Sequence, residues 1–256
     1  LVDRATRQPT EAGTLLLSRT HRIFSELDAA RAELDELAGV ERGTVRAGAI
    51  HWLEPLDLPS LLRAFTTKHP GISVDLREHD ARDMFAMLAD GRMDLVISNI
   101  SPGDQTPATL QRRHLFSEPL VVGVSPDHPL ARRKTVRLAE LSEEPFVAFR
   151  HGSAFRDTVD AALAAATTAP EVRFESSDLV VVRNLVAEGL GIALMPQSLA
   201  AAPGRPIVAL TIAPQPPQRT VAMTWRSNLA LSPPARAFLE LTLDWIDQSN
   251  LTVRTS

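Results

Sequence analysis

The 256-residue sequence contains no cysteine and no tyrosine. Without cysteine, the chain cannot form disulfides, bind a metal through thiolates or use a cysteine nucleophile. No apolar run reaches the roughly 20 residues that a membrane-spanning helix needs, and no apolar signal core opens the chain. These absences predict a cytoplasmic protein that makes no contact with a membrane.

Motifs of the common enzyme classes are also absent. The chain has no GxGxxG, GxxxxGK[ST], GxSxG or HExxH segment. The charged segment REHDARD (77–83) is explained by a strand end followed by a helix start. His151 lies close to Ser153, but a nucleophile needs a base that a third group orients, and the sequence shows none. We therefore expect no catalytic residue, no cofactor and no metal site.

The charge of the chain argues against broad binding of nucleic acid. Its formal net charge is −4, whereas phosphate contacts need clustered Lys and Arg. The exception is a basic group near the start, which comprises Arg4, Arg7, Arg19 and Arg22. Any contact with DNA must come from that local group.

The first 40 residues contain the pattern of a long helix with one apolar seam. Leu16 and Ile23 are seven residues apart, and Leu27 and Leu34 occupy the position four residues later in the same repeat. Such a seam is typical of helices that pair with each other. We predict a linker helix over residues 11–40, terminated by Gly39 and Gly43, whose four apolar residues form a contact between two copies of the chain. The alternative is an amphipathic helix that packs on its own domain.

From residue 44 onward, short apolar runs alternate with amphipathic segments, a pattern typical of an α/β domain. Strands are expected at 44–50, 72–79, 94–100, 118–126, 145–150, 171–177, 192–196 and 219–225. Helices are expected at 58–70, 81–93, 154–166, 179–191 and 232–246, the last capped by Ser232.

Two segments of this region are similar to each other. LADGRMDLVIS (88–98) and VAEGLGIALMP (186–196) both place an acid and a glycine between a helix and a buried strand. Gly91 and Gly189 suit the left-handed position at a helix C-terminus. The repetition predicts two α/β lobes, formed by 44–115 with 219–246 and by 116–218. Two strands that cross between the lobes would leave a hinge and a cleft, where small ligands bind.

The ordered set of segments resembles the LysR-type transcriptional regulators. LVDRATR followed by TEAG is similar to the family's wing-to-linker phrase. GTVRAGA, LPSLLRAFTTKHPGISVDLRE, GRMDLVIS, LVVGVSPDHPLA, LVAEGLGIALMP and SPPARAFLE follow the order of its effector-binding domain. The resemblance implies two Rossmann-like lobes of the type II periplasmic-binding-protein kind behind a linker helix. Residues 1–10 would be the remnant of a winged helix-turn-helix whose recognition helix lies upstream.

The resemblance also implies the partners. A small anionic organic effector would bind between the lobes and shift how a homodimer or homotetramer presents its DNA-binding parts. Arg4 and Arg7 could reach the DNA backbone, which the full-length protein would bind. The alternatives are a solute-binding protein of a transporter with the same two-lobe fold, or a transferase on that scaffold.

Candidate effector-binding residues follow the strand ends that such a cleft would collect. They are His51, Trp52, Ser98, Asn99, Phe149, Arg150, Ser153, Ser177 and Asp178. Trp52 stands where the family often places a small hydroxyl residue, so its ring would narrow the cleft or stack on a flat ligand. For Ser153 and Ser177 the alternative is a turn or helix cap, and for Trp52 it is core packing.

Overall fold

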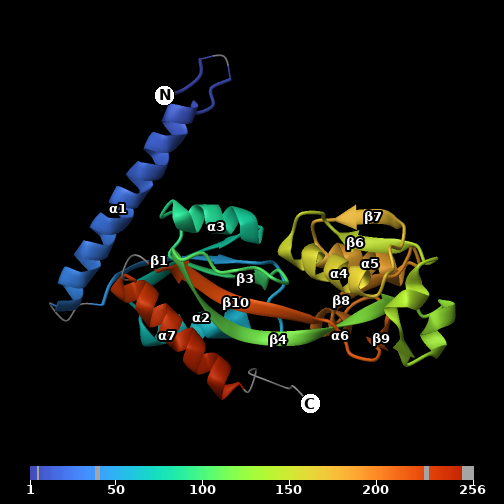
Figure 1. The fold of residues 1–256 in the computed structure, drawn as a ribbon. Coiled ribbons are helices and arrows are strands. Elements are labelled where there is room, and N and C mark those ends of the chain that lie inside the picture. The colour runs from blue at the N-terminus through green and yellow to red at the C-terminus, as the bar shows by residue number, and fades with distance from the viewer. Residues whose placement is uncertain (5, 38–40, 228–230, 250–256) are drawn as a thin grey trace.

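A computed structural model describes residues 1–4, 6–37, 41–227 and 231–249 (Figure 1). Gly39, which we expected to end the first helix, lies outside the described residues. The helices are α1 (Glu11–Leu37), α2 (Leu58–Lys68), α3 (Ala81–Ala89), α4 (Ala154–Ala165), α5 (Leu179–Ala187), α6 (Gln197–Ala201) and α7 (Pro233–Gln248). The strands are β1 (Gly43–Ala49), β2 (Ile72–Glu78), β3 (Leu95–Ile100), β4 (Leu110–Val124), β5 (Thr135–Val136), β6 (Phe146–Phe149), β7 (Val172–Ser176), β8 (Ala193–Pro196), β9 (Val208–Ile212) and β10 (Gln218–Arg226).

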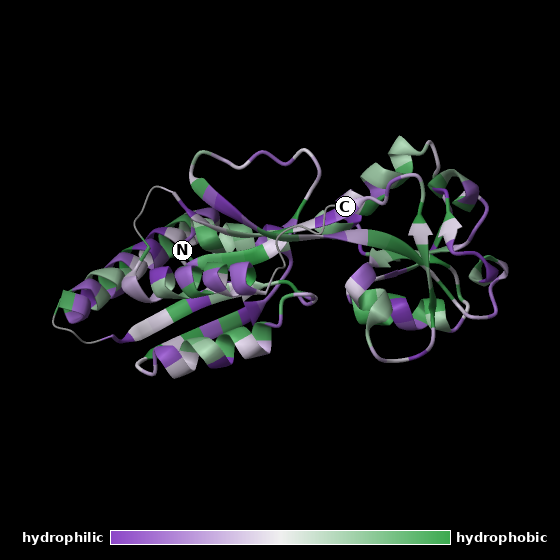
Figure 2. Ribbon diagram, turned by 90° about the horizontal axis from the view of Figure 1, so that it is seen from below, coloured by the Kyte–Doolittle hydropathy of each residue, from purple (hydrophilic) through white to green (hydrophobic). Residues whose placement is uncertain are grey.

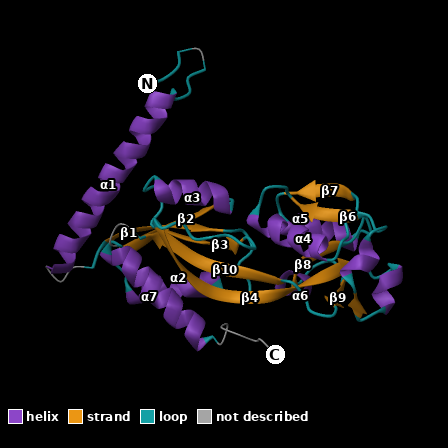
Figure 3. Ribbon diagram, in the orientation of Figure 1, coloured by secondary structure: helices purple, strands orange, loops and turns teal. Residues whose placement is uncertain are grey.

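Two α/β lobes lie side by side, and β4 and β10 run between them (Figures 1 and 3). In lobe I the strand order is β2-β1-β3-β10-β4, with β1 parallel to both β2 and β3, and β10 antiparallel to β3 and β4. Beyond Pro119, β4 leaves β10 and pairs with β8 and β9 of lobe II. Strands β6 and β7 form a separate parallel pair in lobe II.

Lobe I buries apolar side chains on both faces of its sheet. Phe65 of α2 and Phe238 of α7 lie edge to face, 5.1 Å apart, within the core that covers one face. On the other face, Met84 of α3 packs with Met93 in a smaller cluster. A β-carbon at Gly48 of β1 would come within 2.8 Å of both methionine sulfur atoms. Glycine at this position therefore lets α3 approach the sheet closely.

Lobe II has its own apolar core, built on β4, β6 and β8 with the helices α4, α5 and α6. Figure 2 shows hydrophobic colouring on the central strands of both lobes and mixed colouring along the helices. Trp52, which follows β1 of lobe I, packs against the core of lobe II. This indole is therefore shared between the lobes.

The predicted α/β class with two crossover strands is confirmed. Gly91 and Gly189 both adopt left-handed backbone angles, with φ of 75° and 74°, at the ends of α3 and α5. The structure adds α6, β5 and β9, and it begins β4 at Leu110 rather than near residue 118. Ser232 occupies the predicted N-cap position of α7, although its side chain makes no capping hydrogen bond.

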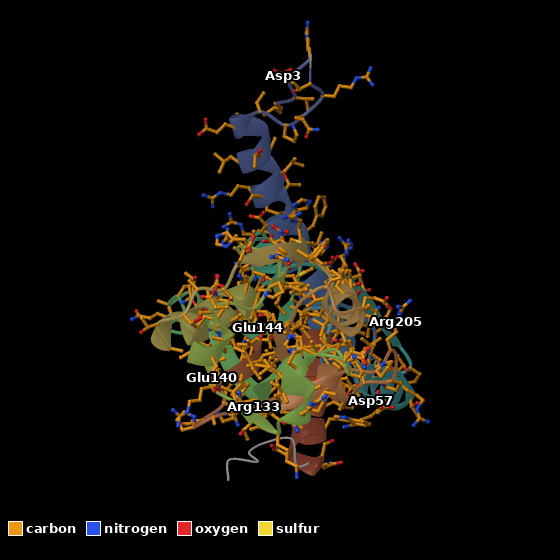
Figure 4. The ribbon with its side chains drawn as sticks, turned by 90° about the vertical axis from the view of Figure 1, so that its right-hand side faces the viewer. Asp3, Asp57, Arg133, Glu140, Glu144 and Arg205 are labelled. Carbon is orange, nitrogen blue, oxygen red and sulfur yellow. The ribbon has the colours of Figure 1, made fainter. Side chains whose placement is uncertain are left out.

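Helix α1 has two different long faces. Small residues, including Ser25 and Ala32, are buried against lobe I. The opposite face carries the predicted seam, and its side chains are 44–67% exposed: Leu16, Ile23, Leu27 and Leu34. Before α1 begins, a β-bridge joins Val2 to Pro9. Asp3 lies at the far tip of the molecule (Figure 4).

Candidate functional site

A small pocket lies where the two lobes meet, with a cavity volume of about 40 Å³. Lobe I supplies the loop after β1, the segment between β2 and α3, and the end of β3. Lobe II supplies the end of β6 and the starts of α4 and α5. The lining residues are Ile50, His51, Trp52, His79, Asp80, Ala81, Asn99, Phe149, Ser153, Ala154, Phe155, Ser177 and Leu179.

Six of the nine predicted effector-binding residues line this pocket: His51, Trp52, Asn99, Phe149, Ser153 and Ser177. Ser98 lies one residue before the wall on β3 and is fully buried. Arg150 follows Phe149 beside the pocket, where it is ion-paired. The carboxylate of Asp178 accepts from the backbone N–H of Val180, at 2.7 Å, at the start of α5.

Three helices begin at the pocket, and a polar side chain precedes each of them. The N-cap residues are Asp80 for α3, Ser153 for α4 and Asp178 for α5. The Ser153 hydroxyl accepts from the backbone N–H of Arg156 and donates to the carbonyl of Arg150, both at 3.1 Å. Ser153 is therefore a helix cap as well as a lining residue. Helix N-termini carry partial positive charge, which the carboxylates of Asp80 and Asp178 meet at α3 and α5, whereas α4 begins with a neutral cap.

Two polar atoms in or next to the pocket wall are buried and have no hydrogen-bond partner within the described part of the chain: Oδ1 of Asn99, which lines the pocket, and Nε of Arg150, which follows Phe149 beside it. Oγ of Ser98 is likewise unpaired, but this residue is fully buried on β3 and does not line the pocket. Buried polar atoms in folded proteins are nearly always paired with protein or with ordered water. The pocket therefore offers one unpaired acceptor in its wall and one unpaired cationic donor beside it, which a ligand or water could pair.

An ion pair joins the lobes beside the pocket. Nη2 of Arg150, in lobe II, contacts Oδ2 of Asp80, in lobe I. A second contact between the lobes is the hydrogen bond from Ser101 Oγ to Asp157 Oδ2, at 3.0 Å. Together these contacts hold the lobes close to each other across the pocket.

Sequence analysis missed His79 and Asp80, because their segment was read only as a strand end and helix start. The available signal was topological: β2 is parallel to β1, so its carboxyl end reaches the same edge of the sheet as His51 and Trp52. Applied to every parallel strand of lobe I, this rule predicts that His79 and Asp80 line the pocket.

A larger cavity, of about 350 Å³, separates α1 from lobe I. Acidic and basic groups alternate along it, and several are already paired, as in the 2.6 Å contact between Arg46 Nη2 and Asp28 Oδ2. Burial raises the pKa of Asp94 in its wall and lowers the pKa of Arg226 opposite. This cavity is the junction of the helix with the lobe, and its mixed charge selects no single ligand class.

No helix in the described part of the chain combines the length and apolar character needed to span a bilayer. Among the same residues, no three His, Asp or Glu side chains gather closely enough to hold a metal ion.

Comparison with known proteins gives a consistent result. Residues 38–247 match the family model described as LysR substrate binding domain. The chain is 30% identical over 246 residues to the uncharacterized HTH-type transcriptional regulator YybE of Bacillus subtilis, covering 95% of this chain and 82% of that protein. Its fold is similar to a full-length OxyR variant from Pseudomonas aeruginosa, with a TM-score of 0.72, 25% identity, and coverage of 96% of this chain and 79% of the other. It is equally similar to the effector-binding domain of QuiR in complex with shikimate, with a TM-score of 0.72, 23% identity, and coverage of 81% and 99%.

Proposed function

The chain belongs to the LysR family of transcriptional regulators, and from this premise we propose that the pocket between its lobes binds a small organic anion as effector. The observation that carries the proposal is the unpartnered Oδ1 of Asn99 in the pocket wall, with the unpartnered Nε of Arg150 beside it. The nine residues of the proposed site are His51, Trp52, Ser98, Asn99, Phe149, Arg150, Ser153, Ser177 and Asp178.

Each polar group of the pocket has a role in this proposal. Arg150 offers an unpaired Nε–H next to the Nη2 group, which suits a carboxylate that accepts two parallel hydrogen bonds. Asn99 Oδ1 accepts from a hydroxyl or amino group of the ligand. The rings of Trp52 and Phe149 supply the flat apolar walls that ligand sites commonly have. A compact carboxylic acid with hydroxyl groups, of the chemical class of the shikimate bound by QuiR, meets these demands.

Effector binding requires a change of shape. The cavity of about 40 Å³ is too small for such a molecule, so the lobes must move apart or the Asp80–Arg150 pair must open. A ligand that binds the opened form shifts the population toward it by its difference in affinity for the two forms. The effector thereby changes the angle between the lobes, which is the signal that the regulator transmits.

Assembly and DNA contact complete the proposal. The exposed seam on α1, formed by Leu16, Ile23, Leu27 and Leu34, pairs with the same seam of a second copy in a homodimer or homotetramer. Arg4 and Arg7 are exposed near the start of α1, where their guanidinium groups can meet DNA phosphates.

The test is a thermal-shift screen of organic acids, followed by titration calorimetry with each acid that stabilises the protein. A true effector stabilises by about 2.7 kcal/mol at a hundredfold excess over its dissociation constant. Trp52→Ala and Asn99→Ala each weaken that acid by more than about tenfold, or 1.4 kcal/mol. Gln215→Ala, on the exposed surface of lobe II, is the control and leaves binding unchanged. Normal binding by both pocket variants would place the site elsewhere.

A further inference from the structure

Two charged residues are buried where the crossover strands of the two lobes lie side by side. Glu118 of β4 and Arg219 of β10 are directly opposite each other in the antiparallel ladder. Arg219 is 0% exposed and Glu118 is 6% exposed, and 2.7 Å separates Nη2 of Arg219 from Oε1 of Glu118. Neither residue lines the effector pocket.

Arg219 also holds the loop that follows β1. Its Nη1 donates to the carbonyl of Trp52, at 3.1 Å, and its Nη2 donates to the carbonyl of Glu54, at 2.8 Å. The guanidinium thus fixes the backbone on both sides of Leu53. This loop carries the Trp52 ring that forms one wall of the pocket.

Glu118 holds lobe II in the same arrangement. Its Oε2 accepts from the backbone N–H of Ser198, at 3.0 Å, at the start of α6. The hydroxyl of Ser198 accepts from Nε1 of Trp52, at 2.9 Å, and donates to the carbonyl of Glu54, at 3.3 Å. The contacts therefore form a closed ring that runs from Trp52 through Ser198, Glu118 and Arg219 back to Trp52.

Such a pair is a poor device for stability alone. Burial removes water from both charged groups, and this loss of solvation raises the pKa of Glu118 and lowers the pKa of Arg219. A buried ion pair often contributes no more than apolar side chains of the same volume. What distinguishes this pair is its hydrogen-bond partners. Glu118 holds Ser198, whose hydroxyl accepts from the Trp52 indole, and Arg219 donates to the backbone carbonyl of Trp52.

We propose that Glu118 and Arg219 are positioning residues that set the orientation of the Trp52 ring in the effector pocket. They act through Ser198 and through the backbone of the loop after β1, without contact with the effector. Because β4, β10, the loop and α6 all take part, the ring occupies its place only at one relative position of the lobes. The consequence for effector affinity rests on the function proposed above.

The experiment measures the Trp52 indole without any ligand. The chain has three tryptophans, so protein labelled with nitrogen-15 at tryptophan gives three indole N–H signals, and Trp52→Phe identifies the relevant one. Glu118→Gln keeps the size of the side chain and removes the ion pair, and Ser198→Ala removes the acceptor of the indole N–H. We expect each variant to raise the hydrogen-exchange rate of the Trp52 indole by at least about tenfold, which corresponds to 1.4 kcal/mol.

Controls come from the same spectrum and from matched variants. The indole signals of Trp225 and Trp245 should keep their shifts and exchange rates, which shows that the variants are folded. Ser227→Ala and Glu140→Gln repeat the same two substitutions away from the ring of contacts and should leave the Trp52 signal unchanged.

Arg219→Lys keeps a positive charge but cannot reach two carbonyls and a carboxylate at once, so it should also speed exchange of the Trp52 indole. If Glu118→Gln does not fold, the exchange rate of the Trp52 indole in Arg219→Lys tests the proposal instead. An unchanged Trp52 signal in folded Glu118→Gln or Arg219→Lys, with a changed one in Ser198→Ala, would overturn the proposal. Because no ligand enters this measurement, a failed effector screen would bear on the proposed function and leave the result on positioning intact.

Discussion

Asp80 at the start of α3 and Arg150 directly after β6 form an ion pair that joins the two lobes beside the pocket. The pair uses Nη2 of Arg150 and leaves its buried Nε without a partner in the described residues. An anionic effector that binds Arg150 therefore competes with the carboxylate of Asp80. This competition gives the first prediction.

Asp80→Asn removes the negative charge while keeping the shape of the side chain. We expect the carboxylic acid identified by the thermal-shift screen to bind this variant about tenfold more tightly, a gain of about 1.4 kcal/mol. Arg150→Ala should weaken the same acid by at least as much, because the charge-assisted hydrogen bonds are lost. Titration calorimetry measures both changes.

The matched control is Asp75→Asn, which removes the same charge from an exposed pair with Arg77 on β2. It should leave the affinity unchanged. Equal affinities of the wild type and Asp80→Asn would show that Asp80 and the effector do not share Arg150.

The second prediction concerns the exposed seam of α1. Ile23→Asp together with Leu27→Asp places two charges on the apolar face that pairs two copies of the chain. We expect sedimentation velocity at tens of micromolar to show a lower order of association than the wild type, with circular dichroism unchanged.

Thr14→Asp together with Leu15→Asp is the control for this change. It alters the net charge of α1 by the same two units, at exposed positions on sides of the helix away from the seam. Its order of association should match that of the wild type. If the double variant also matches, the seam is not the contact between copies.

Asp94 gives a prediction on pH dependence. Burial raises its pKa, although its carboxylate accepts from the backbone N–H of Arg46 at 2.9 Å. Between the ordinary value of about 3.9 and the higher value of the folded state, the folded protein binds more protons than the unfolded one. The contribution of Asp94 to the free energy of unfolding therefore falls as pH rises through that interval. Asp94→Asn should abolish this fall, as measured by urea unfolding from pH 3.5 upward in steps of about half a unit.

Asp75 should change the free energy of unfolding with pH in the opposite direction to Asp94. Its hydrogen bond with Arg77 lowers its pKa, so its contribution is present above the unfolded value and is lost as pH falls through the folded one. Asp75→Asn should therefore reduce the loss of stability in acid. Parallel pH profiles for Asp94→Asn and the wild type would contradict the prediction for Asp94.

The fourth prediction concerns Arg183, which is 5% exposed on α5. Its guanidinium donates to the carbonyls of Leu199, Ala202 and Arg205, at 2.9–3.0 Å, and so fixes the end of α6 and the loop after it. Arg183→Ala leaves three carbonyls without their donor, and we expect the free energy of unfolding to fall by about 3 kcal/mol or more. Chemical denaturation measures the change.

Arg205→Ala is the comparison for Arg183. Arg205 makes an exposed ion pair with Glu188, so its removal should lower the free energy of unfolding by less than about 1 kcal/mol. Similar losses for the two variants would mean that the buried contacts of Arg183 contribute no more than a surface pair.

Much of the fold follows from local patterns in the sequence. The acid–glycine ends of α3 and α5, and the buried strands after them, were predicted because left-handed glycine and apolar runs are local features. The first half of β4 was missed because QRRHLFSE (111–118) is mostly polar, and its role as a strand depends on β10, about a hundred residues later.

The site was less accessible to sequence reasoning. The rule that strands end in the cleft brought His51, Trp52 and Asn99 to the pocket. The partners of Arg150 and Arg219 could not be found in this way, because each pairs with an acid far away in sequence. Such pairs depend on the register and placement of whole lobes, which no local pattern encodes.

The two interpretations of the first helix, pairing with a second copy and packing on its own domain, concern different faces of α1. The seam is exposed, while Ser25 and Ala32 on the opposite face pack against lobe I of the same chain. The small residues carried no apolar signal, so the sequence pattern showed only one of the two faces.

The 15-residue strand β4 has a consequence for how the protein unfolds. Its first part is held by β10 in one core, and its last part by β8 and β9 in the other. If either lobe unfolds, one end of β4 loses its partner strands while the other end is still paired. Unfolding of one lobe therefore weakens the other. Heating should therefore give a single cooperative calorimetric transition, even though each lobe has apolar packing of its own.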